Sequence, residues 1–139
     1  MEREEIKKYL PHREPMLLVD DMRMEGEMAI GHYHVRGDEF FLQGHFPDYP
    51  VVPGVILCEI MGQCCSTLML AELPGRLTFY AGMDKVRFKN QVRPGDTIEV
   101  TGKITSRRGL TFFVDAESKV DGKLCAKGSL IFMLADKEK

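Results

Sequence analysis

Glu59 is the residue whose type and place most clearly demand a chemical role. It stands in an apolar stretch, between Cys58 and Ile60, where a carboxylate without a partner costs free energy. Burial would favour its protonated form near neutral pH, as a general acid requires. Gln63 follows four residues later, within hydrogen-bonding reach on the same face of a helix. A buried polar pair that serves only packing or oligomer register explains Glu59 equally well at this point.

His45 is the candidate base. It lies in the loop Gly44-His45-Phe46-Pro47, and an imidazole can accept a proton near neutral pH without special tuning. A lone loop histidine is more often an ordinary hydrogen-bonding residue. This loop, however, leads to a helix start at Gly54, where free N–H groups and the helix dipole can hold a developing oxyanion. Together, a base, an acid and an anion site predict an elimination. The base would remove a proton from the carbon beside a carbonyl while a β-substituent leaves, and when that substituent is a hydroxyl the reaction is a dehydration.

The element that must position these groups is a helix from Gly54 to about Ala71. This stretch has no turn residue except Gly62 and is too long for a strand. Pro53 suits the first turn, and Leu73-Pro74-Gly75 ends the helix. Because apolar residues occupy nearly every face, we expect the helix to be buried all round, with a sheet wrapped about it.

Six segments predict the strands of that sheet. A Gly26 connection predicts a hairpin between the first two, and Asp121-Gly122 is typical of a tight hairpin turn. We expect the last four to form an antiparallel meander. One α+β domain over residues 1–139 follows, with the sheet curled around the helix. The predicted strands are 16–24, 28–36, 77–89, 97–106, 110–120 and 123–134.

Composition narrows the function classes. The 139 residues are 44% hydrophobic and 29% charged, as in an ordinary globular domain, and the net charge of −2 argues against nucleic-acid binding. Four cysteines without a CxxC pair and a charged N-terminus predict reduced thiols in the cytoplasm. Charged and polar residues within 51–73 exclude a transmembrane segment. His32 and His34 lack a third partner for a metal, and no nucleotide-binding motif occurs.

A series of motifs, in order over about nine-tenths of the chain, resembles the (3R)-hydroxyacyl-[acyl carrier protein] dehydratases of the FabZ type. They include the histidine loop and the pair formed by Glu59 and Gln63. The motifs are Leu10-Pro11-His12-Arg13, Leu17-Leu18-Val19-Asp20, Phe41-Leu42-Gln43-Gly44-His45-Phe46-Pro47, Pro53-Gly54-Val55, Ala81-Gly82-Met83-Asp84, Arg87-Phe88-Lys89, Pro94-Gly95-Asp96 and Arg107-Arg108-Gly109-Leu110.

The resemblance implies a hot-dog fold, a curled antiparallel sheet around one long central helix. It also implies a homo-oligomer, a dimer and usually a trimer of dimers. Each active site would take His45 from one protomer and Glu59 from its mate. The Gly54 N–H would contact the oxyanion, the Val51 carbonyl would fix the histidine, and Gln63 would orient the acid.

The implied reaction forms a trans-2-enoyl thioester in fatty acid biosynthesis, without a metal or organic cofactor. His45 would remove the C2 proton while protonated Glu59 assists loss of the hydroxyl as water. The basic residues after the helix are either a solvated face or a dock for the acyl carrier protein and its phosphopantetheine phosphate. The candidates for that contact are Arg13, Lys89 and Arg108.

Three alternatives stay open. They are a bifunctional dehydratase and isomerase, a hot-dog acyl thioesterase, and a non-catalytic acyl-carrier-binding subunit. The histidine loop argues against a thioesterase, and the presence of both an acid and a base argues against a silent subunit. Asp38 and Gly62, where many relatives have Asn and Ala, leave the tunnel shape and therefore the preferred acyl length open.

Overall fold

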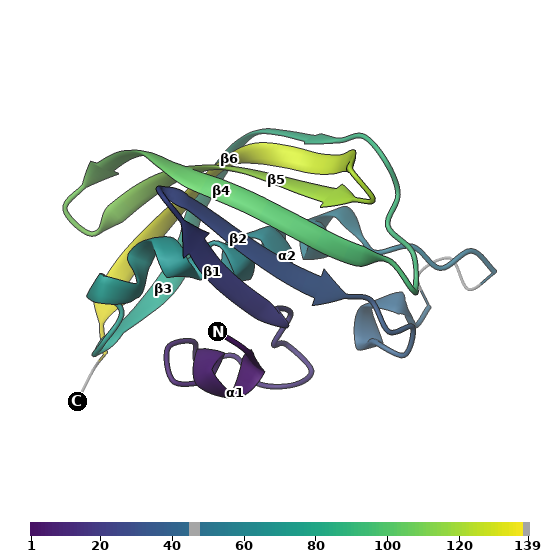
Figure 1. Ribbon diagram of the computed structural model, residues 1–139, viewed down its shortest axis with the longest axis horizontal. Helices are drawn as coiled ribbons and strands as arrows, with labels where there is room; N and C mark the ends of the chain where they lie inside the picture. Colours follow the sequence, from purple (N-terminus) through teal and green to yellow (C-terminus); the bar gives the residue numbers. More distant parts are fainter. Residues whose placement is uncertain (45–47, 138–139) are drawn as a thin grey trace.

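The computed structural model describes residues 1–44 and 48–137 and has the expected α+β class (Figure 1). The long central element is α2, and a curled sheet wraps around it. The elements are α1 (Arg3–Ile6), β1 (Asp21–Glu25), β2 (Met28–His34), η1 (Phe40–Leu42), α2 (Gly54–Cys64), η2 (Ser66–Glu72), β3 (Arg76–Phe88), β4 (Thr97–Arg108), β5 (Thr111–Val120) and β6 (Lys123–Asp136).

The sheet has the strand order β1-β2-β4-β5-β6-β3, with every neighbouring pair antiparallel. The expected meander of the last four strands is therefore wrong in one respect, because β3 pairs with β6 rather than with β4. The cause is the connection between β3 and β4. Gly95 N–H donates to Val35 O (2.8 Å) and Val35 N–H donates to Asp96 O (2.9 Å), which starts β4 beside β2.

Both predicted hairpin turns are confirmed. Glu25 pairs with Met28 around Gly26, whose φ of 61° is the left-handed conformation that such turns need. Asp121 and Gly122, at φ values of 50° and 79°, join β5 to β6 in the same way. The first strand is shorter than predicted, because residues 16–18 bind the Gln63 side chain instead of pairing in the sheet.

The prediction of one continuous helix over 54–71 is wrong beyond Cys64. There α2 ends, and the chain continues as the 3₁₀ helix η2, bent by 45° from α2. Ser66 Oγ donates to Gln63 O (2.6 Å), so a side chain takes a carbonyl that would otherwise serve the next helical turn. No single described helix is long and apolar enough to cross a membrane; only this bent pair together reaches the necessary length and hydropathy.

Glycines in the sheet let α2 approach closely. A Cβ at Gly31 of β2 would lie 2.6 Å from the Cys64 Cβ, and one at Gly102 of β4 would lie 2.5 Å from the Cys65 Sγ. The buried apolar side chains form one cluster in which all four cysteines are free. Contrary to expectation, α2 is not buried all round: Val55 is 75% exposed and the Glu59 side chain 27%.

His32 ties three strands together on the outer face of the sheet. It faces Asp21 of β1 and Glu99 of β4, with Nδ1 2.7 Å from Asp21 Oδ1 and Nε2 3.1 Å from Glu99 Oε2. Burial lowers the pKa of His32, but the hydrogen bonds and charges of the two carboxylates outweigh burial and raise it. The imidazolium form therefore stabilises the folded chain.

We expect His32→Gln to destabilise the protein more in mild acid than in base. A pKa raised by folding gives stability that is complete below the pKa of the unfolded chain and lost as pH rises through the folded value. Asp21 and Glu99 are about half exposed, which weakens their interaction with His32. The substitution should therefore lower the free energy of unfolding by at most about 1 kcal/mol more at about pH 5.5 than at about pH 9. Urea unfolding at both pH values measures it. His34→Gln on the same strand is the control, and equal pH dependence of the two variants would contradict the assignment.

Candidate active site

Glu59 and Gln63 are paired as the sequence predicts. Gln63 Nε2 donates to Glu59 Oε2 at 2.9 Å across one turn of α2. The Gln63 amide is itself held by the backbone: its Oε1 accepts from Leu18 N–H (2.7 Å), and its Nε2 also donates to Met16 O (2.9 Å). Because a backbone N–H requires the amide oxygen, the NH₂ group must face Glu59. One oxygen of the carboxyl group is thus fixed as an acceptor.

His12 is a neighbour of Glu59 that sequence reasoning missed. Its Nε2 lies 3.5 Å from Glu59 Oε2, the same oxygen that Gln63 contacts. His12 belongs to the first motif of the resemblance, in which only Arg13 was assigned a role. The distance along the chain hid the contact, because residue spacing indicates neighbours only within one helix or strand.

Tyr80 of β3 covers the other side of this helical turn. Its hydroxyl donates to the carbonyl of Cys58, and its ring fills the space above Gly62. Burial, followed by the negative charge of Glu59, raises the pKa of Tyr80 far above its ordinary value, so the phenol stays a neutral donor. A glycine stands at position 62 because the tyrosine occupies the place of a side chain.

A cleft of about 600 Å³ opens at the start of α2. There the amide N–H groups of Gly54 and Val55 donate to no residue that the structure describes, as expected for a helix N-terminus. The Phe88 ring lies against Gly54, where a Cβ would be 2.9 Å from it. The cleft is lined by Val51, Val52, Pro53, Gly54, Val55, Leu57, Phe88, Lys89, Asn90 and Gln91. This is a mostly apolar groove with unbonded backbone amides at one end, an arrangement suited to an anion.

The structure brings three expected site residues, Gly54, Val51 and Lys89, together in this cleft. Glu59 and Gln63 are not among its lining residues and instead face residues 12–18. His45, the expected base, lies outside the described residues.

The other two cations expected to meet a carrier protein lie elsewhere. Arg13 is exposed, and its guanidinium donates to the carbonyls of Lys7 (3.0 Å), Leu10 (2.9 Å) and His12 (2.7 Å). Arg108 ends β4 at the opposite end of the sheet from Lys89, whose N–H donates to Cys125 O beside the β5–β6 turn. A single chain does not assemble these cations into one surface.

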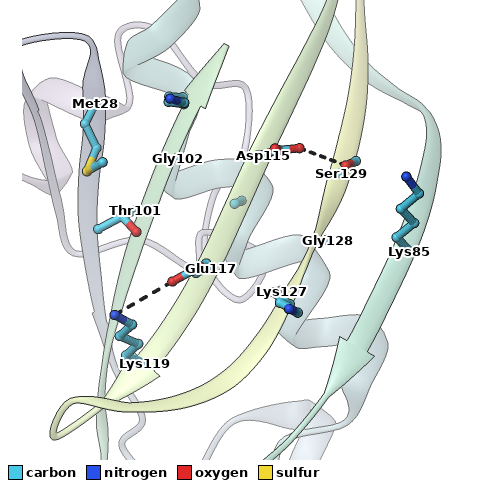
Figure 2. A pocket seen from close by; sticks show the side chains of 12 residues that line it. Met28, Lys85, Thr101, Gly102, Asp115, Glu117, Lys119, Lys127, Gly128 and Ser129 are labelled. Carbon is cyan, nitrogen blue, oxygen red and sulfur yellow. Dashed lines mark hydrogen bonds and ion pairs between the residues drawn. The ribbon is translucent and has the colours of Figure 1, made fainter. Parts of the chain in front are cut away.

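A second hollow, of about 630 Å³, lies on the outer face of the sheet (Figure 2). Its charges alternate in sign: Glu117 is 3.7 Å from Lys119, and Asp115 accepts a hydrogen bond from Ser129 (2.8 Å). Such alternation is typical of a solvated sheet face. Among the residues placed in the structure, no group of three or more histidines, cysteines and acids is arranged to hold a metal.

Comparison with known proteins agrees with this architecture. Residues 10–129 match the family model of the FabA-like domain. The chain is 48% identical over 132 residues to the 3-hydroxyacyl-[acyl-carrier-protein] dehydratase FabZ of Streptococcus sanguinis, covering 93% of this chain and 94% of the relative. The FabZ of Streptococcus agalactiae is 47% identical over 135 residues, covering 95% and 96%.

Solved structures resemble the fold. The dehydratase heterocomplex ApeI:P from Xenorhabdus doucetiae superposes with a TM-score of 0.78 at 20% identity, over 95% of this chain and 91% of that one. The PaaI protein of Escherichia coli gives a TM-score of 0.63 at 17% identity, over 81% of each chain. These likenesses support the hot-dog arrangement of sheet and helix.

We expect Gly62→Ala to destabilise the protein, although alanine favours helices. A Cβ at position 62 would lie 2.5 Å from the Tyr80 hydroxyl oxygen and 2.9 Å from two ring atoms. Overpacking of this kind costs about 1–3 kcal/mol, against a gain of about 1 kcal/mol from helix propensity. Denaturant unfolding of the purified variant measures the difference.

Tyr80→Leu provides the control background, since it removes the ring that Gly62 accommodates. There Gly62→Ala should become neutral or stabilising by up to about 1 kcal/mol. If Gly62→Ala stabilised the protein with Tyr80 present, the Tyr80 ring would have to move without cost, and the predicted steric clash would be wrong.

Proposed function

Because the chain belongs to the FabA-like domain family and acts as a 3-hydroxyacyl-[acyl-carrier-protein] dehydratase of fatty acid biosynthesis, we propose that Glu59 is its general acid and His45 its general base. The observation that carries the acid assignment is the position of Glu59 on α2, where Gln63 holds one carboxyl oxygen and leaves the other available. The assignment of His45 rests on its place in the loop before α2 in the sequence.

The proposed chemistry is an elimination of water from C2 and C3 of the acyl thioester. His45 takes the C2 proton, and the negative charge moves onto the thioester oxygen, where the Gly54 amide stabilises it. Glu59 gives its proton to the C3 hydroxyl, which leaves as water as the C2–C3 double bond forms. After the elimination His45 carries the C2 proton and Glu59 is a carboxylate; His45 releases its proton to solvent and Glu59 takes one from solvent, which restores both groups. The Val51 carbonyl would hold the histidine in position.

We propose that the complete site forms between two copies of the chain. Within one chain, Glu59 does not line the cleft that contains Gly54. The edge strand β3 carries the half-exposed side chains of Phe79, Met83 and Phe88, and Val55 at the helix start is mostly exposed. A second copy that pairs along β3 would cover these apolar groups and bring its Glu59 to the cleft. A trimer of such dimers is the proposed assembly.

The carrier protein is proposed to contact Lys89, which lies exposed at the cleft and forms no described ion pair. Arg13 shares a loop with His12 and would accompany Glu59 to the partner's cleft. Arg108 would contribute only through another protomer, because it lies at the far end of the sheet. A cytoplasmic location is proposed on the ground that all four cysteines are free thiols.

We expect His45→Ala and Glu59→Gln each to lower dehydration of a 3-hydroxyacyl-carrier protein by at least about 100-fold, since each removes a proton-transfer group. Mass spectrometry of the carrier protein detects the loss of water. Release of free thiol by the wild type would favour a thioesterase, a shifted double bond would add isomerase activity, and binding without turnover would indicate a silent subunit.

Mixing the two inactive variants tests the shared site. After subunit exchange, half of the dimers combine both variants, and each of these has one site with an intact His45 and Glu59, so about one quarter of wild-type activity should return. If both residues came from one chain, mixing would restore nothing. Light scattering before and after exchange reports the assembly and confirms that both variants remain oligomeric.

We expect Lys89→Glu to raise KM for the acyl-carrier substrate about 3- to 10-fold, and more than for the same acyl group on free pantetheine, because only the carrier protein presents an acidic surface. Steady-state kinetics at low and moderate salt measure both values. Lys103→Glu, exposed on the outer face of the sheet, is the matched control. Equal effects of the two reversals on the carrier-bound substrate would contradict docking at the cleft.

A further inference from the structure

We propose that His12 is a positioning residue that, together with Gln63, directs the acidic proton of Glu59 to Oε1. The inference rests on the proposed role of Glu59 and extends it to a residue that would act through Glu59 rather than transfer a proton itself. Both nitrogens, His12 Nε2 at 3.5 Å and Gln63 Nε2 at 2.9 Å, approach the same carboxyl oxygen, Oε2.

The surroundings of the imidazole determine which of its nitrogens carries hydrogen. His12 Nδ1 is buried and has no hydrogen-bond partner among the described residues, so an N–H there would be left without an acceptor. Nε2 faces a carboxyl oxygen, and a bare lone pair at that position would repel it. The neutral ring therefore carries its hydrogen on Nε2 and directs it at Glu59.

The hydrogen bond from Gln63 and the His12 N–H 3.5 Å away both favour Oε2 as the acceptor oxygen of the carboxyl group. The neutral acid then keeps its proton on Oε1, the oxygen left available for the substrate hydroxyl. When the proton departs with the leaving water, the same two N–H groups stabilise the carboxylate that remains. His12 thus contributes to the proton-donating step without entering it.

Neighbouring contacts hold His12 in place. The Arg13 guanidinium donates to the carbonyls of Lys7, Leu10 and His12 itself, closing the loop on which the imidazole stands. Gln63 is fixed from the other side by Met16 and Leu18. The Tyr80 hydroxyl lies close enough to Glu59 to feel its charge, but this hydroxyl is committed to the Cys58 carbonyl. The motif Leu10-Pro11-His12-Arg13 thereby gains a function as the support of the acid.

The test compares His12→Leu with His12→Gln in the full-length protein. Leucine removes the donor, and we expect kcat for dehydration to fall about 10- to 100-fold with KM changed less than about threefold. Glutamine can place its Nε2 where the histidine has Nε2, and we expect it to retain at least about one third of wild-type kcat. His34→Gln, on the outer face of the sheet, is the control.

A second substrate separates support of the acid from general damage. A 3-chloroacyl thioester loses its C2 proton to the base and expels chloride, which departs with its electron pair and needs no proton from Glu59. We expect His12→Leu and Glu59→Gln to slow chloride elimination by less than about threefold while both slow dehydration strongly.

The outcomes are distinct. Wild-type dehydration by His12→Leu, or an equal loss of dehydration and chloride elimination, would overturn the role of His12. Loss in His12→Leu with rescue by His12→Gln and a spared chloride reaction supports it. Full dehydration by Glu59→Gln would instead overturn the acid assignment in the proposed function, whatever His12→Leu does.

Discussion

The buried amide of Gln63 is the contact on which the site most depends. It receives a hydrogen bond from Leu18 N–H and donates to Met16 O and to Glu59 Oε2, so one side chain joins the segment 16–18 to the carboxyl group on α2. At 3% exposure, an unsatisfied amide would be expensive, and every bond it makes also fixes its orientation. Because residues 16–18 bond to Gln63, this strand-like segment does not join the sheet and instead packs beside Glu59.

α2 and the sheet approach closely at positions occupied by glycine, which has no side chain. Gly31 and Gly102 admit Cys64 and Cys65 at the end of the helix, while Gly62 admits the Tyr80 ring. These contacts bury one side of α2 and leave the side with Val55 and Glu59 open. The helix is therefore a core element over part of its circumference and borders the surface over the rest.

Local patterns predicted most of the elements, because alternation, turn residues and a helix-starting Pro53 act over a few residues. The break after Cys64 was missed, since the apolar pattern continues while Ser66 takes the Gln63 carbonyl. The far-edge position of β3 was missed because it depends on bonds between residues 95–96 and Val35, distant in sequence. The pair of Glu59 and Gln63 was found from helical spacing, whereas His12 reaches Glu59 only through the tertiary fold.

An elimination of water needs both oxyanion stabilisation and a proton donor. Within one chain, the groups proposed for these two roles lie in different places. Oxyanion stabilisation needs N–H groups that are not already bonded, and at the start of α2 the amides of Gly54 and Val55 donate to no described residue. A proton donor needs a partly shielded carboxyl group supported by other side chains, and the middle of α2 supplies that at Glu59, where Gln63 and His12 meet it. On one helix, these positions lie more than a turn apart and face different neighbours. In the proposed dimer the start of one helix would meet the middle of another, and oligomerisation would then be part of the chemistry.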